Sequence, residues 1–227
     1  MVPDYPEKHL GFGLKVDYGR YHASKMFYDP NKMRRINWGY VVEADDKEKD
    51  HVNKGWAGRI QSIPRVVDFD QKTRNNKLQW PVEWLSSTEF DGVEVGPGKR
   101  VPFDIGTATE QLDISAEFEI DKEALEENVD EHVNYDCWGG AVVRGSFGPF
   151  GLLVNAHPSF SELTLIYFHI AKATGGTLKT FVCTDKSRSS KASSVDKQIY
   201  GAEVPLLYDE NLSMRLLINH SVVESFA

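Results

Sequence analysis

Apolar and polar residues alternate most regularly in segment 112–120, which reads LDISAEFEI. Five apolar positions separated by four polar ones give a period of two, which is the pattern of a half-buried antiparallel strand. Further short strands are predicted around 141–144, 151–155, 163–172, 178–184 and 212–218. Gly175-Gly176 lies between two of these strands and indicates a hairpin. Many short strands with one apolar face predict a β-sandwich.

The region before residue 84 has a different pattern. Aromatic residues and turn signals dominate it, and strands are predicted at 34–43 and on both sides of a polar turn within 54–83. The second of these strands ends at Pro81, which has no N–H group for a sheet. Short strands, aromatics near turns and the lack of a long helical period indicate propeller-like antiparallel sheets. We therefore expect an all-β chain with two domains, 1–83 and 84–227.

Composition excludes several classes of function. The chain has 227 residues, 41% of them hydrophobic, which fits a globular protein. Its net charge of −8 argues against a nucleic-acid partner, which needs a basic surface. No apolar run is long enough for a membrane span, and no secretion signal follows Met1. The seven histidines show no metal-ligand spacing, so we expect no metal or cofactor. The chain is expected to be a monomer.

Two cysteines occur, Cys137 and Cys183, separated by 46 residues in the sequence. Their spacing is not that of a metal site. Composition alone leaves two interpretations open, a pair of buried thiols or one disulfide bond.

A series of longer motifs runs through the chain in order. They read DYGRYHASK at 17–25, WG at 38–39, KGWA at 54–57, QSIPR at 61–65, LQWPVE at 78–83, DIGTAT at 104–109, GPFGLL at 148–153, RSS at 188–190 and HSVVESF at 220–226. With these motifs the chain resembles the plant acid invertases of glycoside hydrolase family 32, which are closely related to fructan exohydrolases and fructosyltransferases. The resemblance covers nearly the whole chain. The sequence at 118–125 is more similar to the vacuolar branch of the family than to the cell-wall branch.

The resemblance implies a five-bladed β-propeller followed by a β-sandwich. Residues 1–83 would then form the last blades of the propeller. Residues 84–227 would form most of the sandwich, without its final strands. The sequence would accordingly be an internal fragment of an invertase-like protein.

The same resemblance predicts that the chain alone is inactive. Retaining glycosidases use one carboxylate as nucleophile and a second carboxyl group as acid/base. The family takes this pair from Asn-Asp-Pro-Asn and Glu-Cys-Pro segments and a third aspartate from Arg-Asp-Pro, and none of these segments occurs here. Asp29-Pro30-Asn31 corresponds instead to a surface turn. The full-length parent would hydrolyse sucrose or fructans, with the choice of substrate and of hydrolase or transferase left open. The alternative is an inactive module that binds a sugar or a partner.

Five residues are candidates for sugar contacts in the parent, because the resemblance puts their strands at the rim of the fructose pocket: Asp17, Tyr18, Tyr21, Trp38 and Glu43. Carboxylates would bind sugar hydroxyls, and aromatic rings would contact the C–H face of a sugar. In the alternative interpretation, the aromatics are blade core and Glu43 begins a solvated loop.

Other features follow from the resemblance as well. It places Cys137 and Cys183 at a sandwich disulfide, if the chain resides in the vacuole or outside the cell. Asn211-Leu212-Ser213 is a candidate glycosylation site at Asn211, whereas Asn219-His220-Ser221 lies in an apolar strand and is expected to be unmodified. Arg59 is an extra residue relative to the family pattern, and Glu110 is a second one.

Overall fold

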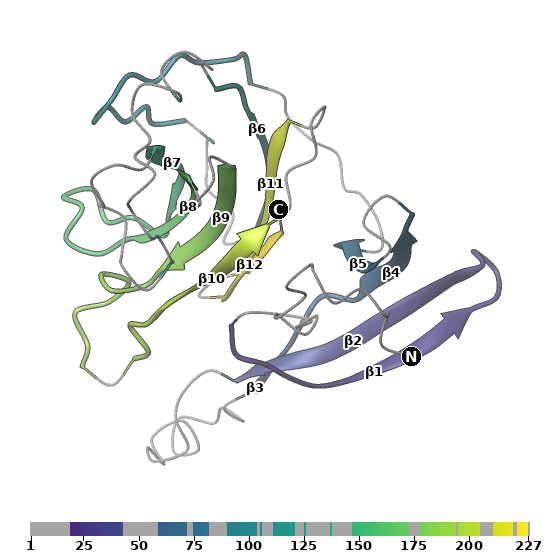
Figure 1. Ribbon diagram of the computed structural model, residues 1–227. Coiled ribbons are helices and arrows are strands. Elements are labelled where there is room, and N and C mark those ends of the chain that lie inside the picture. Colours follow the sequence, from purple (N-terminus) through teal and green to yellow (C-terminus); the bar gives the residue numbers. More distant parts are fainter. Residues whose placement is uncertain are drawn as a thin grey trace.

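A computed structural model of the chain describes residues 19–42, 59–71, 75–81, 90–103, 105, 111–120, 125, 137, 147–172, 178–193, 195–204, 211–219 and 222–226. Within these ranges, twelve β-strands form three antiparallel sheets (Figure 1). The all-β class predicted from the sequence is confirmed. The strand predicted at 141–144 and the hairpin at Gly175-Gly176 lie outside the described residues.

The first sheet lies at the N-terminal side of the molecule and has five strands. They are β1 (Tyr21–Asp29), β2 (Arg34–Val42), β3 (Arg59–Gln61), β4 (Arg65–Asp70) and β5 (Asn75–Pro81). The order is β1-β2-β4-β5, and β3 pairs with β2 beyond the end of β4.

The turn between β1 and β2 is held by Asp29. Its Oδ1 accepts hydrogen bonds from the N–H groups of Asn31 and Lys32, at 3.1 and 3.3 Å, and its Oδ2 accepts one from Arg34 Nε. Asp29-Pro30-Asn31 therefore forms a turn, as the sequence predicted. These contacts also lower the pKa of Asp29, although desolvation opposes them.

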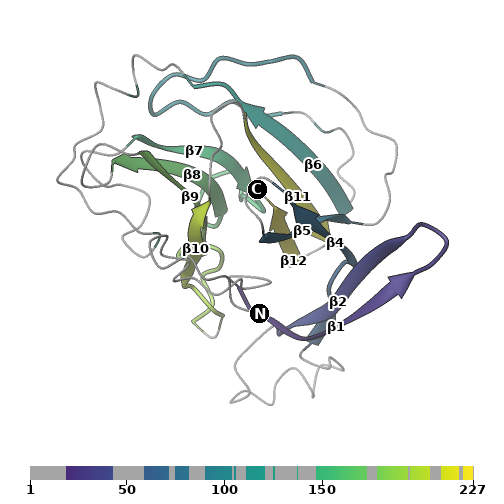
Figure 2. The ribbon, with the colours of Figure 1, turned by 45° about the vertical axis from the view of Figure 1, so that its right-hand side comes forward.

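The other two sheets pack face to face as a sandwich (Figure 2). One has the order β12-β11-β6, from β6 (Gln111–Phe118), β11 (Leu212–Asn219) and β12 (Val222–Phe226). The other has the order β10-β9-β8-β7, from β7 (Phe147–Val154), β8 (Thr164–Lys172), β9 (Leu178–Asp185) and β10 (Ile199–Val204). Exposed and half-buried residues alternate along β6, as its period of two predicted.

The core of the sandwich lies between β8 and β11. Their inward residues are buried: Ile166, Phe168, Ile170, Met214, Leu216 and Ile218. The ring of Phe118 on β6 meets Phe168 edge-on, with centroids 5.7 Å apart, and Phe150 on β7 packs beside both. Full burial of each large apolar side chain contributes about 1.5–3 kcal/mol, so this layer dominates the stability of the fold.

The opposite face of β8 carries a second buried cluster, which contains the disulfide. Cys183 of β9 is bonded to Cys137, with the two Cα atoms 5.6 Å apart. The predicted pairing is therefore confirmed. Gly201 of β10 lies against this bond, because a Cβ atom there would stand 2.4 Å from Cys137 Sγ and 2.2 Å from the Val182 carbonyl oxygen.

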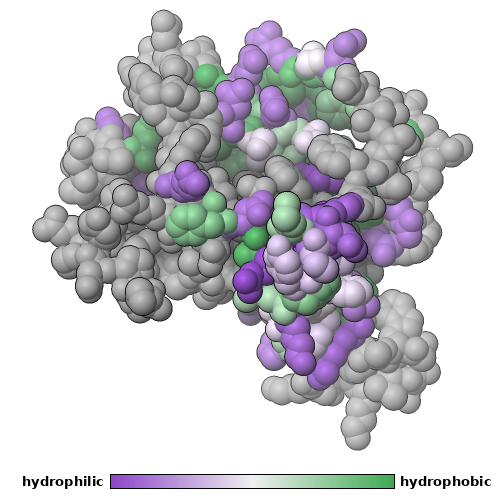
Figure 3. Space-filling model, turned by 90° about the vertical axis from the view of Figure 1, so that its right-hand side faces the viewer, coloured by the Kyte–Doolittle hydropathy of each residue, from purple (hydrophilic) through white to green (hydrophobic). Residues whose placement is uncertain are grey.

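Several large apolar side chains of the first sheet and of its β1–β2 turn are exposed: Met26, Phe27, Tyr28, Met33, Trp38 and Phe69. On the face of the molecule seen in Figure 3, hydrophobic and hydrophilic surface are intermixed. Exposed aromatic rings next to polar side chains are a common feature of binding surfaces. The first sheet is therefore a candidate location for a binding site.

Candidate functional site

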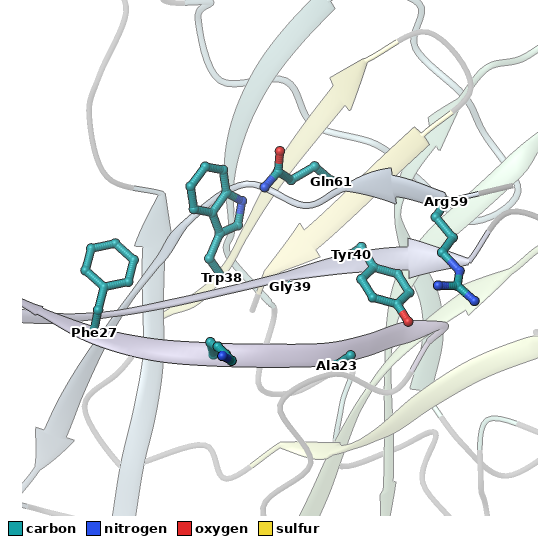
Figure 4. Close-up of a pocket in the computed structure, with 8 residues that line it drawn as sticks. Ala23, Phe27, Trp38, Gly39, Tyr40, Arg59 and Gln61 are labelled. Atoms are coloured by element: carbon teal, nitrogen blue, oxygen red, sulfur yellow. The ribbon is translucent and has the colours of Figure 1, made fainter. Parts of the chain in front are cut away.

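A shallow hollow of about 550 Å³ lies on one face of the first sheet (Figure 4). Side chains from β1, β2 and β3 line it: Ala23, Lys25, Phe27, Trp38, Gly39, Tyr40, Arg59 and Gln61. Trp38 and Tyr40 share this face because side chains two apart on a strand point to the same side. Three aromatic rings and three long polar side chains thus surround one concave surface.

The indole ring of Trp38 is held in a fixed orientation. Its Nε1–H donates a 2.7 Å hydrogen bond to the carbonyl oxygen of Ser62, directly after β3. Ser62 is buried, and its own N–H donates to the Gly39 carbonyl at 3.1 Å. Even so, 38% of Trp38 remains exposed. Trp38 therefore offers a rigid, open aromatic face to a ligand.

Tyr40 and Arg59 lie side by side at the other end of the hollow, as Figure 4 shows. The guanidinium carbon of Arg59 lies 5.1 Å from the centroid of the Tyr40 ring, which is a cation–π distance. The His22 ring is tilted against the same tyrosine, with centroids 5.9 Å apart. This end of the hollow is therefore cationic and aromatic.

A β-bulge in β1 determines which of its residues enter the hollow. His22 pairs with Tyr40 and Lys25 pairs with Trp38, so two residues of β1 stand opposite Gly39 alone. Ala23, one of the two, has a φ of 42°, in the left-handed region. After the bulge, Lys25 lies directly across from Trp38 and on the same face of the sheet.

Tyr21 lies on the opposite face of the same sheet. A Cβ atom added at Gly39 would stand 2.6 Å from Tyr21 Cζ, so the tyrosine ring covers the side of β2 from which Trp38 and Tyr40 point away. The Tyr21 hydroxyl is buried and has no hydrogen-bond partner among the described residues.

Of the five residues predicted to contact sugar, only Tyr21 and Trp38 fall within the described ranges, and the structure does not bring them together. Trp38 lines the hollow and Tyr21 faces away from it. Asp17, Tyr18 and Glu43 lie outside the described residues. Sugar contact by any of the five remains a prediction.

Arg65 connects the first sheet to the sandwich. Its Nη2 lies 2.8 Å from Glu224 Oε2 on β12, and both side chains are about 5% exposed or less. Glu224 Oε1 also accepts a 2.8 Å hydrogen bond from the Ile63 N–H group. The Arg65 guanidinium lies between the rings of Tyr21 and Phe226, 4.7 and 5.0 Å from their centroids. Sequence reasoning missed this pair, because nothing local to either motif signals a partner so distant in the chain.

A second contact joins Arg20, just before β1, to Asp196 in the connection between β9 and β10, at 3.1 Å. Lys186 Nζ and the Tyr200 hydroxyl each donate a 2.7 Å hydrogen bond to the same carboxylate oxygen. Burial on its own would raise the pKa of Asp196. The hydrogen bonds from Lys186, Tyr200 and the Gln198 N–H outweigh burial and lower this pKa from 3.8 to about 2.

Three further predictions concern a metal site, a membrane span and glycosylation. The part of the chain that the structure describes contains no cluster of His, Cys, Asp or Glu residues able to hold a metal ion. In the same ranges, no helix is long and apolar enough to cross a membrane. Asn211 is exposed directly before β11, and its glycosylation remains a prediction.

Comparisons with known proteins place the whole chain in one group. Residues 4–81 match the model of the glycosyl hydrolases family 32 N-terminal domain, and residues 73–227 match that of the family 32 C terminal. The chain is 50% identical over 233 residues to vacuolar acid beta-fructofuranosidase 2 of a Rosa hybrid cultivar, and 52% identical over 234 residues to acid beta-fructofuranosidase of Vicia faba. It is also 47% identical to 6(G)-fructosyltransferase of Asparagus officinalis. These matches cover 100% of this chain but only 36–38% of the relatives.

A solved structure agrees with these matches. The crystal structure of fructan 1-exohydrolase IIa from Cichorium intybus superposes with a TM-score of 0.81 at 33% identity, covering 94% of this chain and 41% of that one. A variant of the same enzyme in complex with 1-kestose superposes with a TM-score of 0.82.

Proposed function

The chain belongs to glycoside hydrolase family 32, and we propose that it forms part of the propeller and most of the sandwich of a β-fructofuranosidase-type hydrolase. The observation that carries this proposal is the identity of about 50% to acid β-fructofuranosidases along the entire chain. Sucrose or a fructan is the proposed substrate. The relatives also include a fructosyltransferase, so sequence similarity alone does not select hydrolysis over transfer.

We further propose that the chain by itself does not turn over substrate. Its 227 residues contain no Asn-Asp-Pro-Asn, Arg-Asp-Pro or Glu-Cys-Pro segment, the sources of the acidic residues that the family resemblance requires. The proposed division at residue 83 assigns the hollow to the propeller part, and the disulfide and β12 to the sandwich part.

A chimera tests the hydrolase proposal. The chain would replace the matching residues of the Vicia faba relative, and release of reducing sugar from sucrose and from inulin would be measured. The unmodified relative is the positive control, and the same relative without these residues is the negative control. We expect the chimera to cleave at least one substrate and the chain alone to cleave neither. A folded but inactive chimera would contradict the hydrolase proposal, and turnover by the isolated chain would contradict its inactivity.

A vacuolar or extracellular location is part of the proposal. Two relatives carry the word vacuolar in their names, and a disulfide persists in oxidising compartments. Thiol titration of the denatured protein purified from its source tissue should show neither cysteine free. Two free thiols would contradict this location.

The hollow favours a second candidate function, that of a sugar-binding module. An exposed indole fixed by a hydrogen bond, next to amide and cationic side chains, is a suitable surface for a sugar ring. This function needs no catalytic carboxylates, and binding measurements on the chain test it directly.

A further inference from the structure

We propose that the hollow binds a carbohydrate that carries a negative charge, in the form of a carboxylate or a phosphate group. The proposal rests on the sugar-binding candidate function and adds the class of sugar. The chain as a whole carries a net charge of −8. The described residues that line the hollow nevertheless include two cations, Lys25 and Arg59, and no carboxylate. The described lining of the hollow therefore has the opposite charge to the chain as a whole.

Arg59 is placed to bind an anion at one end of the hollow. Its guanidinium carbon lies 5.1 Å from the centroid of the Tyr40 ring. The five N–H donors of a guanidinium form a planar fork that matches the two oxygens of a carboxylate or phosphate. Arg59 pairs with Val42 at the start of β3, which fixes its backbone beside the aromatic residues.

Trp38 supplies the surface for the sugar ring itself. The hydrogen bond from its Nε1 to Ser62 fixes the indole plane without a ligand, so little ordering is needed on binding. Lys25 lies directly across from Trp38 on the neighbouring strand β1. Gln61 lies on β3, beside the strand that carries Trp38 (Figure 4). A ring stacked on Trp38 would have the Gln61 amide within reach of a hydroxyl and cations on either side of it.

The charge of the hollow makes binding selective and weak. Because Lys25 and Arg59 are exposed, each contributes modestly and is screened by salt. We therefore expect dissociation constants on the order of 1 mM for a monosaccharide. A neutral sugar would stack on Trp38 equally well but would gain nothing from the two cations.

The test uses the full chain and matched ligand pairs, followed by NMR through the indole N–H signal of Trp38. Galacturonic acid is compared with galactose, fructose 6-phosphate with fructose, and inorganic phosphate serves as a probe of charge alone. We expect each charged sugar to bind about five- to tenfold more tightly than its neutral counterpart at low salt, with the difference decreasing near 0.5 M salt. The two pairs distinguish carboxylate from phosphate as the preferred anion.

Variants assign the effect to the hollow. Arg59→Gln and Lys25→Gln should each weaken binding of the charged sugars about threefold or more while leaving the neutral sugars unchanged. Arg35→Gln is the matched control, because it removes a cation from β2 on the face away from Trp38.

Four outcomes would overturn the inference. Equal binding of charged and neutral sugars would remove the charge preference and leave the sugar-binding function in place. Inorganic phosphate binding as tightly as fructose 6-phosphate would remove the role of the sugar ring. Binding unaffected by Arg59→Gln and Lys25→Gln would place the site elsewhere. If no ligand binds, both the inference and the sugar-binding function are wrong. The hydrolase proposal is then unaffected, because the chimera tests it separately.

Discussion

Arg65 and Glu224 form a buried ion pair between the first sheet and the sandwich, 159 residues apart in the sequence and 2.8 Å apart in space. The arginine is held between two aromatic rings, and the carboxylate also accepts the Ile63 N–H group. Both charged groups lose their hydration on folding, and the attraction between them offsets this desolvation penalty. The position of the sandwich relative to the first sheet is fixed at this point.

Replacing Glu224 by alanine should destabilise the protein strongly, because Arg65 would remain buried without its charge partner. We expect a loss of about 3–5 kcal/mol in the free energy of unfolding, measured by urea denaturation. Glu203→Ala is the matched control, since Glu203 pairs with Lys179 at 2.9 Å on the exposed surface of the sandwich. Its loss should be at most about 1 kcal/mol. Equal losses for the two variants would show that the buried pair has no special role.

The disulfide should contribute substantially to stability. It closes a loop of 46 residues, and chain entropy predicts a contribution of about 4 kcal/mol for a loop of this size. The double variant Cys137→Ser and Cys183→Ser should therefore melt well below the parent chain in calorimetry. A reducing agent should lower the melting temperature of the parent and leave that of the double variant unchanged. A parent insensitive to reduction would contradict this prediction.

Stability should fall at low pH in a window set by Asp196. Its pKa is lowered from 3.8 to about 2 in the folded chain, so the folded state favours the charged form. The stabilisation is fully present above about pH 4 and is lost as the pH falls toward 2. This shift corresponds to about 2 kcal/mol. Urea denaturation of the parent and of Asp196→Asn should differ by this amount near pH 6 and converge near pH 2. A difference that does not depend on pH would exclude the carboxylate as its source.

Gly39 should not tolerate a side chain while Tyr21 is present. An added Cβ atom would lie 2.6 Å from Tyr21 Cζ and 2.8 Å from its hydroxyl oxygen. Gly39→Ala alone should therefore cost about 1–3 kcal/mol through overpacking. In a double-mutant cycle with Tyr21→Ala, the combined loss should be smaller than the sum of the two single losses by about 1 kcal/mol. Additive losses would place the Tyr21 ring elsewhere than over Gly39.

The period of two in segment 112–120 predicted β6 and its half-buried face, because local alternation depends only on neighbouring residues. The turn at Asp29 followed in the same way from local hydrogen bonding. The disulfide was predicted only through the family resemblance, since the sequence alone left buried thiols equally open. Contacts between distant segments, such as Arg65–Glu224, leave no trace in a local pattern.

The separation of Tyr21 and Trp38 shows a further limit. Both belong to aromatic strands of the first sheet, and the resemblance grouped them in one pocket. Strand register decides the matter, because Tyr21 pairs with Val41 and thus shares the face of Gly39. The irregular step after His22 then changes which residues of β1 face Trp38. Neither register nor bulge can be read from residue types alone.

The β-bulge in β1 has a consequence for how this surface could change. If Ala23 were deleted and the pairing of His22 with Tyr40 kept, Ser24 alone would stand opposite Gly39, and Lys25 and Phe27 would still face Trp38 and Ile36. If instead one residue were lost between Lys25 and Phe27, Tyr28 would take the place of Phe27 opposite Ile36, and every later residue of β1 would change faces. The bulge is thus a position where this strand can lose a codon and keep the same side chains beside Trp38.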